Sequence, residues 1–135
     1  MKILYIVPYV PNLIRVRPYN LIRHLAVAGH EVTVVTILAD AEEQKDVDFL
    51  KQFCTRVVAM QMPTWRSWLN SLFALLQRIP MQSRYSFHPM LFREITELLE
   101  NDGISTTYDM IHIEHLRGMN YGLQLLSWKN ANGNN

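Results

Sequence analysis

The chain has 135 residues, of which 49% are hydrophobic and 19% charged, and its formal net charge is +1. This balance suits one globular domain with its own core and excludes a disordered chain. The near-zero charge predicts no broad footprint for nucleic acid. The single cysteine, Cys54, excludes an internal disulfide and a multi-cysteine metal site. No apolar run reaches the ~18 residues needed to cross a bilayer.

The first half of the chain alternates between predicted strands and helices. Residues 3–7 form a continuous apolar, β-branched run, as in a strand that is buried on both faces. A helix is predicted from Pro18 to a stop at Gly29, and residues 31–37 form a second buried strand. Asp40 and Glu43 have the spacing of a capping box, which predicts a helix to about residue 53, and residues 56–62 form a third strand. This order predicts an α/β domain with a parallel sheet and right-handed crossovers, in a three-layer, Rossmann-like arrangement.

The second half continues the pattern after an interruption. Residues 65–79 are rich in apolar side chains at helical spacing, and Pro80 ends the segment. The remaining predicted elements are a helix at 89–101, a fourth strand at 109–115 and a helix at 119–128. Residues 129–135 are polar and of low complexity, so we expect a disordered tail after a domain of residues 1–128.

The turn between the first strand and the first helix contains no glycine, although such turns are commonly glycine-rich in nucleotide-binding α/β folds. It holds two arginines, Arg15 and Arg17, and three prolines restrict its backbone: Pro8, Pro11 and Pro18. A helix N-terminus favours anions and arginine matches phosphate oxygens, so a phosphate-binding loop is one interpretation. The alternative is that both arginines are solvated, or that they pair with Glu42 or Glu43.

The fourth predicted strand carries polar groups near its carboxyl end, where parallel sheets bind ligands. These are His112, Glu114 and His115, and they could contact a sugar hydroxyl. His112 and Glu114 share a strand face, whereas His115 is expected on the other face. No third metal ligand is evident, so no metal site is predicted. A polar patch without a ligand is the alternative, and the sequence assigns no catalytic residue.

A second candidate surface lies in the interrupting segment. One helical stripe of it contains Trp65, Trp68, Leu69, Leu72 and Phe73. Such a stripe could dock on a membrane interface. The alternative is a helix whose apolar stripe packs against the sheet.

Two stretches together resemble a known family. "MKILYIVPYVP…RPYNLIRHLAVAGHEVTVVT" resembles the start of the family 4-like glycosyltransferases with the two-domain GT-B fold, and "YDMIHIEH" resembles their later "DVVHxH" strand. Two positions depart from that pattern: the family's first loop carries glycines, and its second histidine aligns with Glu114.

The resemblance implies that this chain is the N-terminal, acceptor-side half of a GT-B enzyme, without the C-terminal donor domain. The parent enzyme would transfer a sugar from a nucleotide-sugar donor to a lipid-linked or polysaccharide acceptor, with no cofactor. It would be cytoplasmic and could contact the inner membrane face. The chain alone is expected to be inactive, and a separate donor-domain chain is a conceivable partner. The alternative is a non-catalytic α/β module that binds phosphate or a protein partner.

Overall fold

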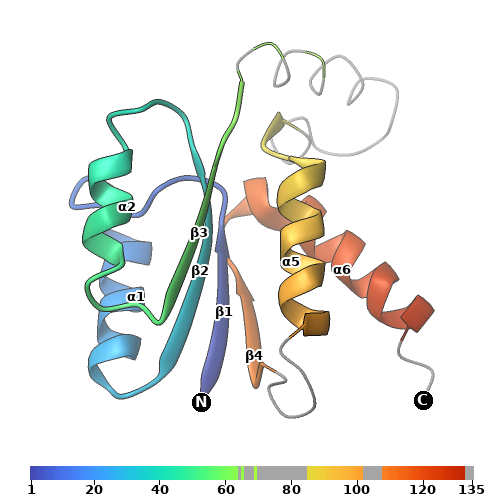
Figure 1. The fold of residues 1–135 in the computed structure, drawn as a ribbon, viewed down its shortest axis with the longest axis horizontal. Coiled ribbons are helices and arrows are strands. Elements are labelled where there is room, and N and C mark those ends of the chain that lie inside the picture. The colour runs from blue at the N-terminus through green and yellow to red at the C-terminus, as the bar shows by residue number, and fades with distance from the viewer. Residues whose placement is uncertain (64, 66–68, 70–84, 102–107, 133–135) are drawn as a thin grey trace.

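The computed structural model describes residues 1–63, 65, 69, 85–101 and 108–132. Within these ranges the chain forms parallel strands flanked by helices (Figure 1). The strands are β1 (Lys2–Val7), β2 (Glu31–Leu38), β3 (Arg56–Gln61) and β4 (Met110–Ile113). The helices are α1 (Val16–Val27), α2 (Gln44–Leu50), α5 (Pro89–Asn101) and α6 (Met119–Asn132), with a 3-10 turn, η1 (Leu116–Gly118), before α6.

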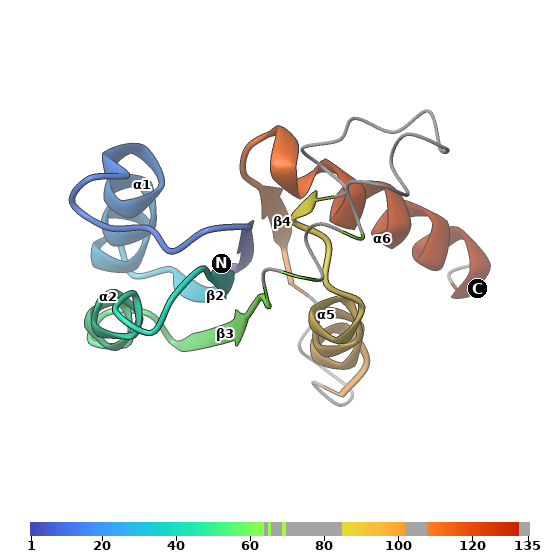
Figure 2. The ribbon, with the colours of Figure 1, turned by 90° about the horizontal axis from the view of Figure 1, so that it is seen from above.

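The sheet has four strands in the order β3-β2-β1-β4, and every neighbouring pair is parallel. Helices α1 and α2 cover one face, and α5 and α6 cover the other (Figures 1 and 2). The predicted three-layer, Rossmann-like α/β arrangement is therefore confirmed. Tyr5 lies in register with Val34 on one side and His112 on the other.

Alternate residues of the central strands build two separate cores, which explains their unbroken apolar sequences. On β1, Leu4 and Ile6 belong to the core beneath α5 and α6, whereas Tyr5 and Val7 belong to the core beneath α1 and α2. Cys54 is buried in the second core, and burial raises the pKa of its thiol to about 12.

The first two helices differ in extent from the predictions. Helix α1 begins at Val16, so Pro18 lies within its first turn, where a missing N–H costs no hydrogen bond. Its chain reversal uses Gly29 at φ 84°, a conformation that glycine adopts without strain. Helix α2 is shorter than expected, because regular helix starts only at Gln44 and ends at Leu50.

The last two elements also differ from the predictions. Strand β4 ends at Ile113, two residues before the predicted end. Helix α6 continues to Asn132, so residues 129–132 are helical and do not belong to a disordered tail. Residues 133–135 lie outside the described ranges, as does most of the predicted helix at 65–79. Among the described residues, no helix combines the length and apolarity needed to cross a bilayer.

Candidate functional site

The strand order reverses between β1 and β4, because β2 and β3 lie on one side of β1 and β4 lies on the other. In open parallel sheets, ligands bind outside the carboxyl ends of the strands at such a point. A hollow of about 340 Å³ lies there. Its lining comes from the loop and helix after β1 and from the turn after β4: Tyr9, Arg15, Val16, Arg17, Pro18, His115 and Arg117.

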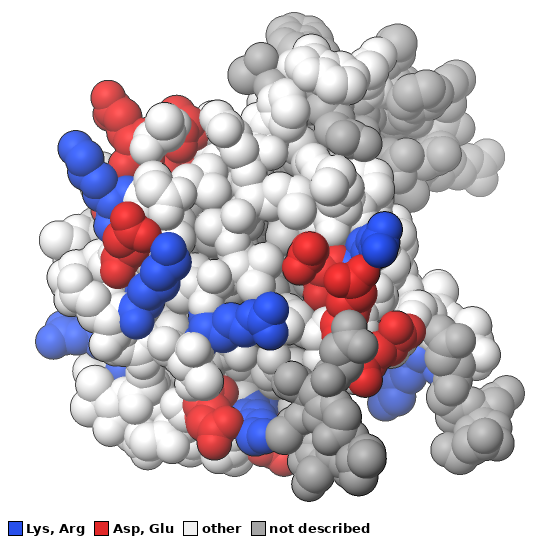
Figure 3. Space-filling view, in the orientation of Figure 1, with Lys and Arg blue, Asp and Glu red and all other residues white. Residues whose placement is uncertain are grey.

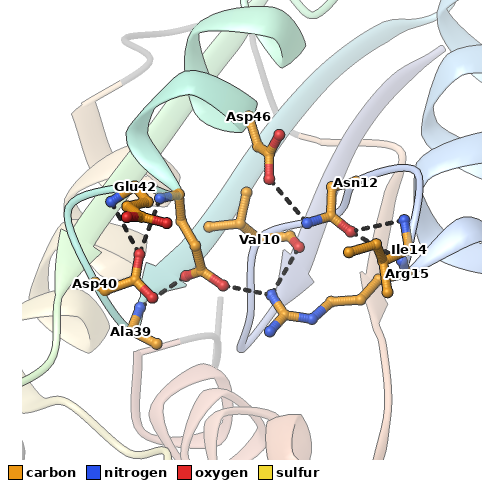
Figure 4. Close-up of polar contacts among 9 residues, drawn as sticks. Val10, Asn12, Ile14, Arg15, Ala39, Asp40, Glu42 and Asp46 are labelled. Carbon is orange, nitrogen blue, oxygen red and sulfur yellow. Dashed lines mark hydrogen bonds and ion pairs between the residues drawn. The ribbon is translucent and has the colours of Figure 1, made fainter.

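Hydrogen bonds made by side chains hold the loop after β1 in place (Figure 4). The Asn12 side chain accepts from the backbone N–H groups of Ile14 and Arg15, at 3.1 and 2.9 Å, and donates to Asp46 at 2.8 Å. Asn12 therefore does for this turn what a capping residue does at a helix start. Its bond to Asp46 also ties the loop to α2.

Arg15 supplies a second tie between the same two segments. Its Nη1 donates to the carbonyl of Val10 at 3.1 Å and to Glu43 at 2.7 Å, and its guanidinium lies 5.3 Å from the centre of the Tyr9 ring. The pairing with Glu43 is one of the alternatives that the sequence left open. Arg15 thus stiffens the wall of the hollow, with part of its donor set already in use.

Glu43 is fixed in turn by the turn that precedes α2. Its other carboxylate oxygen accepts from the backbone N–H of Ala39 at 2.8 Å, and Asp40 accepts from the N–H groups of Glu42 and Glu43. The arrangement resembles the predicted capping box, except that Glu43 reaches the residue before Asp40. Both carboxylate oxygens of Glu43 are therefore bonded, Oε2 to the N–H of Ala39 and Oε1 to Arg15 of the loop after β1.

A buried carboxylate lies where β4 ends. Glu114 is 7% exposed, and one of its oxygens accepts from the Tyr5 hydroxyl at 2.9 Å. The same oxygen lies 3.0 Å from Nε2 of His112, which must carry the proton because an ionised carboxylate only accepts. The Tyr5 and His112 rings stack with centroids 4.5 Å apart. Arg17 approaches the other oxygen at 3.8 Å.

These contacts set the protonation states of the cluster. Burial raises the pKa of Glu114, but the hydrogen bonds from His112 and Tyr5 and the charge of Arg17 outweigh it, so the net pKa is lowered. Burial, reinforced by Glu114, raises the pKa of Tyr5. Glu114 is therefore ionised at neutral pH, and its lowered pKa makes it a poor general base.

His115 occupies an unusual backbone position. Its φ is 67° and its ψ is 156°, a combination that strains any residue with a side chain. Its ring meets the Tyr9 ring edge-on with centroids 6.0 Å apart, and its Nδ1 accepts from the N–H of Arg117. Since β4 has already ended, the alternation of a strand does not place His115, and the ring lines the hollow beside Arg17.

Close packing behind the hollow requires a glycine after His115. A Cβ atom on Gly118 would lie 2.7 Å from Cγ2 of Ile113 and 3.8 Å from Cδ of Pro8. The residue after β1 and the turn after β4 therefore meet at Gly118. The absence of a side chain there lets the two loops approach each other.

Of the predicted substrate-binding residues, Arg15, Arg17 and His115 line one hollow, and the half-buried His112 and the buried Glu114 form a hydrogen-bonded pair next to it. Sequence reasoning missed Arg117. The rule that selected Arg15 and Arg17, a basic side chain in the turn just before a predicted helix, would have selected it in "EHLRG" as well. The described part of the chain contains no group of three potential metal ligands.

Basic and acidic side chains are interspersed over the molecular face shown in Figure 3, with no large area of one sign. Of the proposed membrane-docking stripe, Trp65 and Leu69 are described, and these residues are 62% and 45% exposed. Trp68, Leu72 and Phe73 lie outside the described residues. Membrane docking by this segment stays a prediction.

Comparisons with known proteins identify no relative of this chain. No family model matches the chain, and neither a curated protein nor a solved structure matches it.

Proposed function

We propose that this chain is the acceptor-side domain of a GT-B-type glycosyltransferase and that its hollow binds a phosphate group of a nucleotide-sugar or of a lipid-linked acceptor. One observation carries the proposal: a hollow lined by three arginines lies at the point where the order of parallel strands reverses. The resemblance of the sequence to family 4-like glycosyltransferases supports the choice of substrate class.

The arginines of the hollow differ in whether they are available to contact a ligand. Arg15 is committed to Glu43 and the Val10 carbonyl, so it shapes the wall. The side chain of Arg17 is 87% exposed, and its nearest anion, Glu114, lies 3.8 Å away, beyond hydrogen-bond distance. Arg17 and the exposed Arg117 can therefore turn toward a phosphate, which would gain charge-assisted hydrogen bonds from both.

The N-terminus of α1 adds to this attraction. The helix begins at Val16, and Val16, Arg17 and Pro18 all line the hollow. Backbone N–H groups of a first helical turn lack partners within the helix and favour an anion. Asn12 already accepts from the N–H of Arg15, so the N–H groups of Val16 and Arg17 are the ones left for a ligand.

Binding of inorganic pyrophosphate and of uridine and guanosine diphosphate sugars, measured by calorimetry, tests the proposal. We expect Arg17→Ala combined with Arg117→Ala to weaken binding at least about tenfold, since each lost charged hydrogen bond is worth roughly 1.5–3 kcal/mol. Arg93→Ala is the matched control, because Arg93 is an exposed arginine on α5 that pairs with Glu97. Equal binding by all three proteins would contradict the proposal.

The chain supplies one wall of a cleft in this account, so we expect binding without turnover. Sugar transfer would require a donor domain, on the same polypeptide or on a separate chain in the cytoplasm. Transfer or hydrolysis of the sugar nucleotide by this chain alone would contradict that expectation.

A non-catalytic phosphate-binding module is the second candidate. The state of Glu114 favours it, because a carboxylate that already accepts from Tyr5 and His112 has little basicity left. Addition of a candidate donor domain separates the two functions. Complex formation with transferase activity supports the glycosyltransferase, and ligand binding that never gains activity supports the module.

A further inference from the structure

Glu114 places a fixed negative charge beside the hollow. Its side chain is buried, and Oε2 accepts from the Tyr5 hydroxyl at 2.9 Å and lies 3.0 Å from Nε2 of His112. The backbone N–H of Glu114 also donates to the carbonyl of Ile6 at 2.9 Å. The carboxylate is therefore held at the end of β4 and cannot turn away from a ligand, as a carboxylate on a flexible surface side chain can.

The second oxygen of this carboxylate has an arginine of the hollow as its cation. Among the described residues Oε1 of Glu114 accepts no hydrogen bond, and it lies 3.8 Å from Nε of Arg17. Arg17 lines the hollow, and its side chain is 87% exposed. A buried carboxylate is costly unless cations and hydrogen bonds compensate it fully. The stability of the fold therefore does not by itself explain why the chain has a carboxylate at this position.

The charges around the hollow nearly cancel. Three arginines line it, but Arg15 is paired with Glu43 at 2.7 Å and Arg17 lies against the buried carboxylate. Among the described residues, no carboxylate pairs with Arg117. His115 adds no charge in this arrangement, because its Nδ1 accepts from the N–H of Arg117. Three guanidinium groups and two carboxylates thus leave a net of one positive charge.

The charge of Glu114 acts on groups within the hollow. Burial raises the pKa of Tyr9, which is a lining residue, and the charge of Glu114 raises it further. A phosphate bound near Arg17 would meet the same negative charge. The Coulomb energy between two charges is proportional to each of them. A doubly charged phosphate therefore loses twice as much binding free energy to this repulsion as a singly charged one.

We propose that Glu114 determines the charge specificity of the hollow: its fixed carboxylate, next to Arg17, disfavours a doubly charged terminal phosphate and thereby favours a phosphate that is esterified on both sides. A terminal phosphate ionises a second time with a pKa of about 6, whereas a phosphodiester keeps a single charge. The favoured form is that of a diphosphate bridge between two organic groups. The inference rests on the proposed function, because it concerns the ligand of the same hollow.

Titrations of the ¹⁵N-labelled protein with methyl phosphate and with dimethyl phosphate at pH 8 test the inference. At this pH the monoester is doubly charged and the diester singly charged, and the two probes are close in size. Glu114→Gln removes the charge and keeps the shape of the side chain. We expect this variant to bind dimethyl phosphate about threefold and methyl phosphate about tenfold more tightly than the wild type, because doubling the ligand charge squares the gain in affinity.

Two further variants separate this effect from other consequences of mutation. Glu31→Gln also removes one carboxylate, but Glu31 is the first residue of β2, at the opposite end of the strands from the hollow. Because β2 is eight residues long, the separation exceeds the Debye length of about 8–10 Å, and both affinities should stay at their wild-type values. Glu114→Asp keeps the negative charge, so it should retain the wild-type ratio of the two affinities.

Circular dichroism shows whether Glu114→Gln folds. If it does not, Tyr5→Phe combined with Glu114→Leu removes the same charge without leaving the Tyr5 hydroxyl unpaired, and the same two gains are expected. Any result in which methyl phosphate does not gain more affinity than dimethyl phosphate would overturn the inference and leave the proposed function standing. If the wild type binds neither probe, the inference is overturned as well, and the binding of pyrophosphate then decides separately on the proposed function.

Discussion

The two segments that close the hollow hold their shapes by different means. Side-chain hydrogen bonds from Asn12 and Arg15 to α2 and its preceding turn fix the long loop after β1, and prolines limit its backbone. The short turn after β4 depends instead on a strained His115 and on the missing side chain of Gly118. A loop held by several side-chain hydrogen bonds tolerates the loss of one of them, whereas a closely packed turn does not tolerate an added side chain. Mutations in the turn after β4 should therefore lower the free energy of unfolding more than mutations in the loop after β1.

The largest loss of stability is expected for Gly118→Ala. The new Cβ would lie 2.7 Å from Cγ2 of Ile113, a branch that cannot move away without shifting β4. Overpacking of this kind should lower the free energy of unfolding by about 2–3 kcal/mol, measured by urea denaturation.

Gly122→Ala provides a matched control, because its Cβ would meet Cδ1 of the same isoleucine at 2.8 Å. Ile113→Val removes Cδ1 and keeps Cγ2. It should therefore rescue Gly122→Ala but not Gly118→Ala. Rescue of both variants would show that the close approach of Gly118 to Ile113 does not control this turn.

Glu114→Gln is expected to cost about 1–2 kcal/mol at neutral pH, because the amide accepts more weakly from Tyr5 and His112 than the carboxylate does. The pKa of Glu114 is lowered below its ordinary value of 4.5 by folding. Its contribution to stability is therefore complete above that value and is lost as the pH falls through the folded pKa.

The free energies of unfolding of the wild type and of Glu114→Gln, measured from pH 7 down to pH 3, test this direction of the pH dependence. The difference between the two free energies should become smaller as the pH falls. A gap that widens toward low pH would mean that Glu114 is not held ionised.

The backbone strain at His115 predicts that a glycine at this position stabilises the fold. Glycine adopts a φ of 67° freely, so His115→Gly should raise the free energy of unfolding by about 1 kcal/mol, even though the edge contact with Tyr9 is lost. His115→Ala loses the same contact but keeps the strain, and it should be the less stable of the two by thermal denaturation. Equal stabilities for the alanine and glycine variants would argue against backbone strain.

Arg15→Ala should cost about 1 kcal/mol, because its hydrogen bonds to Glu43 and the Val10 carbonyl are only partly buried. A double-mutant cycle with Glu43→Gln isolates the tie between the loop and α2. Coupling near zero would show that the salt bridge does not brace the loop.

Arg17→Ala is expected to change stability by less than about 0.5 kcal/mol, since its side chain is almost fully exposed. It should nevertheless weaken pyrophosphate binding in calorimetry. A large loss of stability would assign Arg17 to the framework, together with Arg15.

The fold follows from the sequence because its determinants are local. The β-branched runs of β1 and β2, the amphipathic pattern of 89–101 and the stop at Gly29 each report on neighbouring residues. Parallel pairing then follows from the alternation of strands and helices, whereas the order of the strands was not predicted. The end of α6 was mispredicted because polar residues such as Asn130 can continue an existing helix, although they rarely start one.

The site was harder to predict because its contacts span the chain. Tyr5 and Glu114 are 109 positions apart, and Arg15 is 28 positions from Glu43. Nothing local distinguishes the paired Arg15 from the exposed Arg17. The backbone of His115 is also set by tertiary packing, since it must turn the chain from β4 into η1 above Ile113.

The most direct test of the central claim is a nuclear magnetic resonance titration of the ¹⁵N-labelled chain with pyrophosphate. We expect the largest amide shifts on both sides of the hollow, at Val16 and Arg17 and at His115 and Arg117, and we expect them to vanish in the Arg17→Ala, Arg117→Ala protein. Shifts confined to α5 and α6, or shifts of equal size in the double variant, would contradict it.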